Sequence, residues 1–111
     1  MKKEQKFKYK DASGKMAEKT LTLEFRDIDR GRAEDGPLFY AAMDLVAQRS
    51  ENGSLLLGKM AQDMGDKFVN QLLKNEPDKT DFALLKKDYV AMYDLNVSLL
   101  VEIIIPFITA N

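Results

Sequence analysis

The chain has 111 residues, of which 45% are hydrophobic and 32% charged, and its formal net charge is −1. This length and balance fit one globular domain, residues 1–111, with its own hydrophobic core. The chain contains no cysteine, histidine or tryptophan. Without cysteine and histidine it has no disulfides, no zinc site of the usual ligand types and no Ser-His or Cys-His catalytic pair. We therefore expect a non-catalytic protein without a cofactor or a metal.

The charge is unevenly distributed along the chain. Residues 1–26 carry eight Lys or Arg and four Asp or Glu, a net charge of +4. Residues 27–111 carry nine and fourteen, a net charge of −5, and the two parts sum to −1. A basic segment joined to an acidic body could favour head-to-tail association or nucleic-acid binding. Alternatively, the lysines belong to a solvated edge strand that they protect from unwanted pairing.

Two stretches near the N-terminus alternate between apolar and polar residues, as half-buried β-strands do. A turn composition at 11–14 separates them. We therefore predict an antiparallel hairpin with strands at about 5–10 and 18–26, whose open edges could pair with a neighbouring chain. The residues predicted on its inner face are Gln5, Phe7, Tyr9, Leu21, Leu23 and Phe25.

The segment 27–36 begins with the alternating aspartates of a calcium-binding loop but does not complete the pattern. Arg32 stands at the sixth position, where the motif requires Gly, and Leu38 stands at the twelfth, where it requires Glu. The segment is therefore predicted to be a connecting loop.

Two helices are predicted to follow, at about 37–49 and 55–74, the first with a proline in its first turn. In the second, Gly58, Ala61 and Gly65 recur at steps of three and four and form a small-residue groove. Each glycine costs about 1 kcal/mol relative to alanine in a helix interior. The groove could admit a second helix, from within the fold or from a partner. Alternatively, the glycines are tolerated on an exposed face.

The last third of the chain predicts one helix at about 78–105, which ends or kinks near Ile105 because of Pro106. Asn96 is the one polar residue in its apolar stripe. A lone Asn can fix the register of a paired helix, or it can bond a backbone carbonyl or a water within the fold. The stripe consists of Phe82, Leu85, Tyr89, Met92, Asn96, Leu99 and Ile103.

The C-terminal end is more apolar than one surface helix can bury alone. We therefore predict that Ile103, Ile104, Phe107 and Ile108 form a partner or oligomer interface. If so, Ile104→Asp should dissolve the oligomer and preserve helix content, whereas unfolding would place these residues in the core. The apolar run 95–108 is shorter than the roughly 20 residues of a membrane span. We therefore expect a cytoplasmic protein with no membrane contact.

These elements predict an α+β domain in which an N-terminal antiparallel β-hairpin precedes three α-helices packed as a small bundle. One functional class that fits is an assembly or chaperone-like protein that self-associates and binds apolar helical segments. The alternative is a small regulatory or nucleic-acid-associated protein that uses the lysines and aromatics at 6–10. The acidic pI of about 5.5 disfavours nucleic acid. The candidate protein-binding residues are Gly58, Ala61, Gly65, Asn96, Ile103, Ile104, Phe107 and Ile108.

The hairpin sequences at 6–10 and 19–25, the helices that follow and the total length resemble the tail assembly chaperones of long-tailed phages, in the form found in Gram-positive prophages. The resemblance implies a non-catalytic protein in the cytoplasm of the bacterial host. It also implies a protein partner of the tape-measure or tail-tube type, together with homo-oligomers. The family has no short signature, so the resemblance assigns no functional residues.

Overall fold

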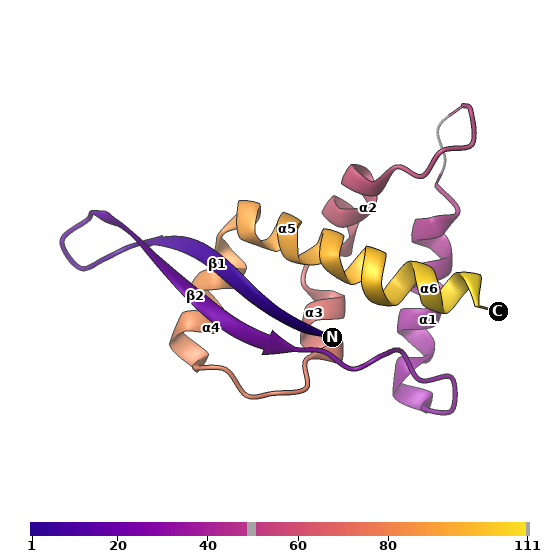
Figure 1. Ribbon diagram of the computed structural model, residues 1–111, viewed down its shortest axis with the longest axis horizontal. Coiled ribbons are helices and arrows are strands. Elements are labelled where there is room, and N and C mark those ends of the chain that lie inside the picture. The colour runs from indigo at the N-terminus through magenta and orange to yellow at the C-terminus, as the bar shows by residue number, and fades with distance from the viewer. Residues whose placement is uncertain (49–50, 111) are drawn as a thin grey trace.

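The computed structural model describes residues 1–48 and 51–110 and places a β-hairpin beside a layer of helices (Figure 1). The predicted α+β class with an N-terminal antiparallel hairpin is confirmed, but the described residues form five helices rather than three, when the continuous α5 and α6 are counted as one. The predicted end of the first helix, at residue 49, lies outside the described residues. The elements are β1 (Lys2–Lys10), β2 (Met16–Glu24), a 3₁₀ turn (Ala33–Asp35), α1 (Gly36–Val46), α2 (Leu57–Met64), α3 (Lys67–Leu72), α4 (Lys79–Lys87) and α5 (Tyr89–Leu99), which continues through a π-helical turn (Leu100–Ile104) into α6 (Ile105–Thr109).

The turn of the hairpin is held by the side chain of Asp11. Its Oδ1 accepts hydrogen bonds from the backbone N–H groups of Ser13 at 2.9 Å and Lys15 at 3.0 Å. Gly14 supplies the positive φ of +82° that closes the turn, a conformation glycine adopts without steric cost. The strands pair from Lys2 opposite Glu24 to Lys10 opposite Met16. Each strand therefore starts two or three residues earlier than predicted.

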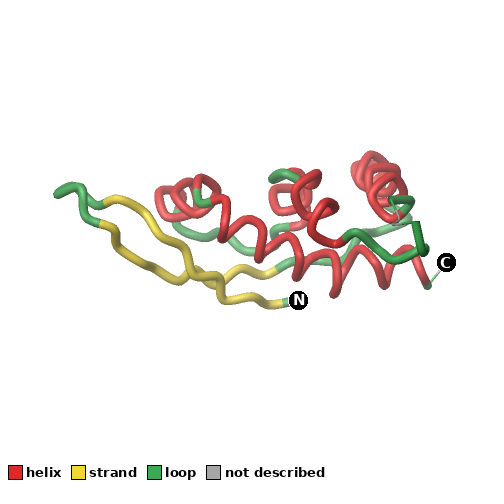
Figure 2. Tube along the Cα trace, turned by 90° about the horizontal axis from the view of Figure 1, so that it is seen from above, coloured by secondary structure: helices red, strands yellow, loops and turns green. Residues whose placement is uncertain are grey.

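One face of the hairpin is buried, as the alternating pattern predicts. Phe7 and Leu23 are 1% and 0% exposed, whereas Lys6 and Lys8 are exposed on the other face. The buried face packs against α4 and α5. Figure 2 shows the strands on one side of the helices, with the turn of the hairpin reaching past the helical layer.

Both edges of the hairpin are partly occupied by other segments of the chain. On β2, Lys74 N donates to Glu24 O at 2.7 Å, and Asn75 Nδ2 donates to Thr22 O at 2.9 Å. On β1, Lys8 N donates to Asp88 Oδ2 at 2.8 Å. These bonds use backbone groups that the predicted open edges would otherwise offer to a neighbouring strand.

Both of the longer predicted helices are interrupted. Gly65 takes φ +56° and ψ −132°, which ends α2 and separates it from α3. Asp88 takes an extended conformation and caps α5, accepting from Val90 N at 3.1 Å and Ala91 N at 3.3 Å. The predictions of single helices over 55–74 and 78–105 were therefore wrong. A glycine backbone and an N-cap side chain offered local alternatives to a continuous helix.

Gly65→Ala is expected to destabilise the domain by about 1–3 kcal/mol, because an L side chain rarely adopts this backbone conformation. Gly58→Ala is the matched control. A Cβ at Gly58 would lie 3.2 Å from the hydroxyl of Tyr93, which is the end of a side chain that can shift. Urea unfolding of both variants checks the prediction. An equal loss in both would show that the conformation of Gly65 is not strained for alanine.

The sequence predicted that the helix ends or kinks near Ile105; it does not end there but continues past Pro106. Proline lacks the N–H that would bond one turn back, and its ring crowds that carbonyl. Immediately before it, the helix widens into the π-helical turn, where Ile105 N donates to Leu100 O. The wider turn allows the helix to continue through Pro106 to Thr109, so α5 and α6 form one rod in Figure 1.

This rod, Tyr89–Thr109, has 21 residues and is long and apolar enough to cross a membrane. From the sequence alone, only the shorter apolar run 95–108 was compared with the length of a membrane span. Much of the rod's apolar character is accounted for by its buried face. The α5 part of the rod packs on the hairpin, α2 and α3, and α6 packs on α1. The rod residues buried in the core are Ala91, Met92, Leu95, Leu99, Leu100, Ile103 and Ile104.

A buried ion pair fixes the loop between the hairpin and α1. The Asp35 side chain is 1% exposed and receives Arg26 Nη1 on Oδ2 at 2.6 Å and Arg26 Nη2 on Oδ1 at 2.8 Å. Asp29 N also donates to it at 2.9 Å. Hydrogen bonding from the Arg26 guanidinium, opposed by burial, lowers the pKa of Asp35 well below its usual range. The carboxylate therefore stays charged in the folded protein.

Candidate functional site

An exposed apolar ridge stands on the first turns of α5. Tyr89, Val90 and Tyr93 are 83%, 62% and 45% exposed, and together they form what we call the α5 ridge. The predicted apolar stripe placed Tyr89 in the core. That placement was wrong, because the break at Asp88 resets the helical phase between α4 and α5.

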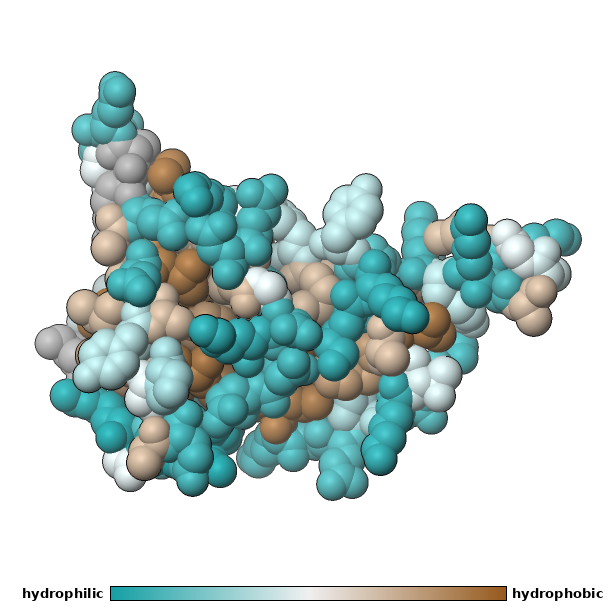
Figure 3. All heavy atoms as spheres, turned by 180° about the vertical axis from the view of Figure 1, so that it is seen from behind, coloured by the Kyte–Doolittle hydropathy of each residue, from teal (hydrophilic) through white to brown (hydrophobic). Residues whose placement is uncertain are grey.

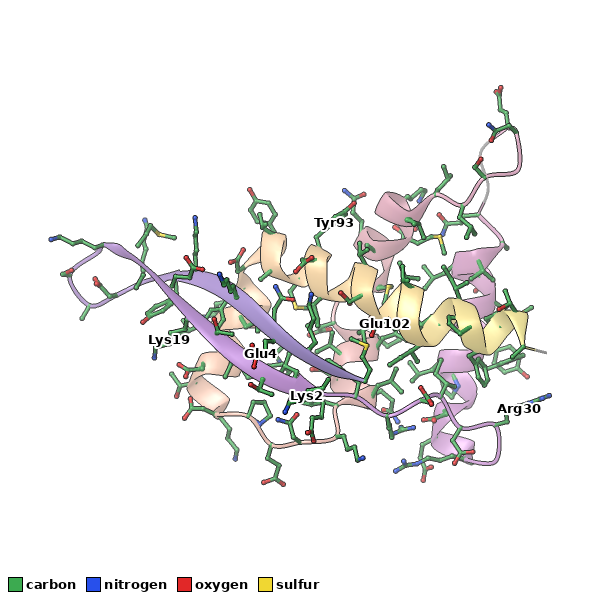
Figure 4. All side chains as sticks on the ribbon, in the orientation of Figure 1. Lys2, Glu4, Lys19, Arg30, Tyr93 and Glu102 are labelled. Atoms are coloured by element: carbon green, nitrogen blue, oxygen red, sulfur yellow. The ribbon has the colours of Figure 1, made fainter. Side chains whose placement is uncertain are left out.

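The first of two hollows beside the ridge lies between α2 and α5 and has a volume of about 720 Å³. We call it the α2–α5 hollow. In Figure 4, Tyr93 lies on the side of α5 that is next to α2. The apolar wall of the α2–α5 hollow is formed by the ridge and the buried Met92. Lys86 and Lys87 also line the hollow. The lining residues are Ala61, Gln62, Gly65, Asp66, Lys86, Lys87, Tyr89, Val90, Met92, Tyr93 and Asn96.

Asn96 lines this hollow and is 2% exposed. Its Nδ2 donates to Gly65 O at 2.7 Å and to Ala61 O at 3.3 Å. Of the two alternatives for Asn96, a bond to a backbone carbonyl is therefore the one observed. Its Oδ1, however, is buried and has no hydrogen-bond partner among the described residues.

The small-residue groove of α2 receives a helix of the same chain. α5 packs on α2, with Ala61 buried between them. Gly58 faces the Tyr93 hydroxyl, and the carbonyl of Gly65 holds Asn96. The structure thus brings four predicted residues, Gly58, Ala61, Gly65 and Asn96, to one place.

The second hollow lies between β1 and the start of α5 and has a volume of about 730 Å³. We call it the β1–α5 hollow. Gln5 lines it and is 3% exposed, and its Nε2 donates to Lys6 O at 3.0 Å and Asp94 Oδ2 at 3.1 Å. Gln5 Oε1 is buried without a partner among the described residues. The α5 ridge separates the two hollows and contributes all three of its residues to each.

The charged side chains around the ridge differ in whether they already have a partner within the chain. Asp88 is occupied as the α5 cap and by Lys8 N, and Asp94 accepts from Gln5 and lies 3.5 Å from Lys3 Nζ. By contrast, four lysines beside the hollows form no ion pair with the described residues. They are Lys6, Lys8, Lys86 and Lys87. Lys86 donates instead to Asn70 Oδ1 at 3.3 Å, and Glu18 lies opposite Lys8 in the hairpin register.

The predicted C-terminal candidates lie at the other end of the rod and divide into two pairs. Ile103 and Ile104 are 3% and 0% exposed and belong to the core, so their side chains are closed to a partner in this fold. Phe107 and Ile108 are half-buried against the core. The Phe107 ring meets that of Phe39 edge to face, with centroids 6.1 Å apart.

The site contains groups suited to binding. Its lining supplies apolar side chains, amides, lysines and tyrosine hydroxyls. Among residues 1–48 and 51–110, no group of three or more acidic, His or Cys side chains is placed to hold a metal ion. Figure 3 shows that polar side chains cover much of the back of the molecule, with apolar patches between them.

Sequence reasoning missed the α5 ridge, although a signal for it was present. Lys86 and Lys87 suit the last turn of a helix, and Asp88 is a favoured N-cap residue, so this sequence could have marked a break. Comparisons with protein-family models, with curated proteins and with solved structures found no match for this chain.

Proposed function

We propose that this chain is a non-catalytic protein-binding module that acts as a tail assembly chaperone does and holds an apolar helical segment of a phage tail protein. The observation that carries the proposal is the α5 ridge, an exposed apolar surface between two hollows. The partner would be of the tape-measure or tail-tube type that the sequence resemblance implies.

The α5 ridge is an exposed apolar surface on a rigid support. Contiguous exposed apolar residues rimmed by polar ones are typical of interaction sites. Tyrosine offers large contact area at low entropic cost, and it is enriched where interfaces concentrate their binding energy. Because the ridge stands on a helix capped by Asp88 and packed on α2, it keeps its shape before a partner arrives.

Hollows of this size on both sides suit a segment that projects side chains in two directions. Each has a volume near 700 Å³, within the range of protein ligand sites. An amphipathic helix lying along the ridge could place apolar residues in both. Self-association remains part of the proposal. Tyr40 and Met43 on α1, 70% and 44% exposed, offer a second apolar surface for it.

Val90→Glu is expected to weaken binding of an amphipathic Leu- and Glu-rich helical peptide at least about tenfold, because the new charge must be desolvated at the centre of the contact. Val101→Glu is the matched control. Val101 lies on the same rod and is 51% exposed, but it lines neither hollow. Isothermal titration calorimetry measures the affinities, and light scattering on the same samples measures the oligomeric state.

Both substitutions lie at exposed positions, so circular dichroism should show the same helix content for both variants. If the peptide binds the two variants equally, the ridge is not the binding surface. If the unsubstituted chain binds no such peptide, the proposed function is wrong.

The nucleic-acid alternative is favoured by one observation, the exposed lysines at even positions of β1, among them Lys6 and Lys8. The aromatic residues interleaved with them do not share that face. Phe7 is 1% exposed and Tyr9 is half-buried against the core, so neither is free to stack on a base. DNA binding with a steep salt dependence, lost on replacing Lys6 and Lys8, would favour this alternative.

A further inference from the structure

Asn96, which lines the α2–α5 hollow, has a hydrogen-bond acceptor that the described part of the chain leaves without a donor. Asn96 Oδ1 is fully covered, whereas the other end of the same amide is bonded to two backbone carbonyls. These two carbonyls also fix the orientation of the amide. A flipped Asn96 would place Oδ1 against two other oxygens, so the acceptor cannot exchange places with the donor.

An unpaired buried acceptor is costly, so a ligand that supplies a donor here gains more than an ordinary surface hydrogen bond. Tyr89 and Tyr93 line the same hollow as Asn96 and are 83% and 45% exposed. Because Asn96 Oδ1 itself is covered, a bound donor reaches it only when the side chains that cover it move. The hollow thus combines apolar walls with a few polar groups, among them the oriented amide of Asn96, which is the usual composition of a specific pocket.

The walls restrict which donor fits. Lys86 and Lys87 outnumber Asp66 among the charged residues of the lining and disfavour the cationic donors of lysine and arginine. Hydroxyl and amide side chains would bring acceptors of their own into a largely apolar space. The indole of tryptophan is the neutral side chain that only donates. Its ring could stack on the two tyrosines and contact the sulfur of Met92.

We infer that the α2–α5 hollow binds a tryptophan side chain of a partner protein, with the indole N–H donating to Asn96 Oδ1. This inference rests on the proposed function and names the anchor residue of the bound segment. The chain itself has no tryptophan, so a second copy cannot supply the anchor. Lys87, which forms no ion pair with the described residues, fits an acidic residue of the partner beside the tryptophan.

The test uses three Leu- and Glu-rich helical peptides that differ only at one central position, which holds Trp, 1-methyl-Trp or Phe. The methyl group removes the donor and keeps the ring. We expect the Trp peptide to bind the full chain about fivefold to tenfold more tightly than the 1-methyl-Trp peptide, as the loss of one buried hydrogen bond requires. Isothermal titration calorimetry gives the affinities.

Fluorescence provides a second measurement, because the chain contributes no tryptophan emission. The emission of the Trp peptide should shift to shorter wavelength on binding, and Val90→Glu should abolish the shift while Val101→Glu preserves it. If all three peptides bind equally and binding still requires Val90, the indole inference is overturned and the proposed function stands. If none of the peptides binds, both are overturned.

Discussion

Ile104→Asp is expected to unfold the domain at neutral pH. The Ile104 side chain is 0% exposed and belongs to the core cluster. An unpaired carboxylate there costs several kcal/mol, and a domain of this kind has a total stability of only about 5–15 kcal/mol. Circular dichroism should show loss of the helical signal. Ile104→Ala, which leaves a cavity without a charge, should cost about 2–5 kcal/mol and leave the domain folded.

This expectation reverses the one based on sequence alone, in which Ile104→Asp would dissolve an oligomer and spare the helices. Val101→Asp is the control, because Val101 lies three residues earlier in the same π-helical turn and is 51% exposed. It should leave helix content and urea midpoint nearly unchanged. A folded Ile104→Asp variant whose only change is a smaller particle in light scattering would show that Ile104 lies at an interface.

Asp35→Asn is expected to destabilise the domain by about 3 kcal/mol at neutral pH. The substitution removes one charge of a buried pair and leaves the guanidinium of Arg26, 21% exposed, without its counter-ion. It also weakens the acceptor for Asp29 N. Urea unfolding measures the loss. Glu34→Gln, which changes the neighbouring exposed ion pair with Arg32, should have little effect.

The Arg26–Asp35 ion pair makes the stability of the domain depend on pH. The pKa of Asp35 is lower in the folded protein than its unfolded value of about 3.9, chiefly because Arg26 hydrogen-bonds the carboxylate. The pair's contribution is therefore fully present above about pH 5 and is lost as the pH falls towards the folded pKa. The difference in the free energy of unfolding between Asp35→Asn and the unsubstituted protein should therefore narrow as the pH falls below 5. A constant difference would mean that Asp35 does not titrate differently on folding.

The buried face and the turn of the hairpin were predicted from local sequence alone. Alternation alone placed Phe7 and Leu23 on the buried face, and the composition at 11–14 located the turn that Asp11 and Gly14 close. These features depend on neighbours in sequence and on a period of two. They could therefore be predicted without knowledge of the rest of the fold.

The helix boundaries and the binding surface were not predicted in the same way. Periodicity continued across Asp88 and placed Tyr89 in the apolar stripe, although the chain restarts its helix at that point. Asn96 was recognised as unusual, but its two possible roles could be separated only when the carbonyls of Ala61 and Gly65 were seen beside it. The outcome for Asn96 depends on contacts between segments that are distant in sequence, whereas the restart at Asp88 is a local cap whose signal the continuing periodicity outweighed.

The sequence by itself determined the α+β class, the hairpin with its buried face, and the absence of cysteine and histidine chemistry. Only the tertiary structure decided which apolar residues of the last third are covered. Ile103 and Ile104 are buried, and the α5 ridge at the opposite end of the rod is exposed. The physical reason is that hydrophobicity records a need for burial but not which surface meets it, and that depends on how α2, α5 and the hairpin pack.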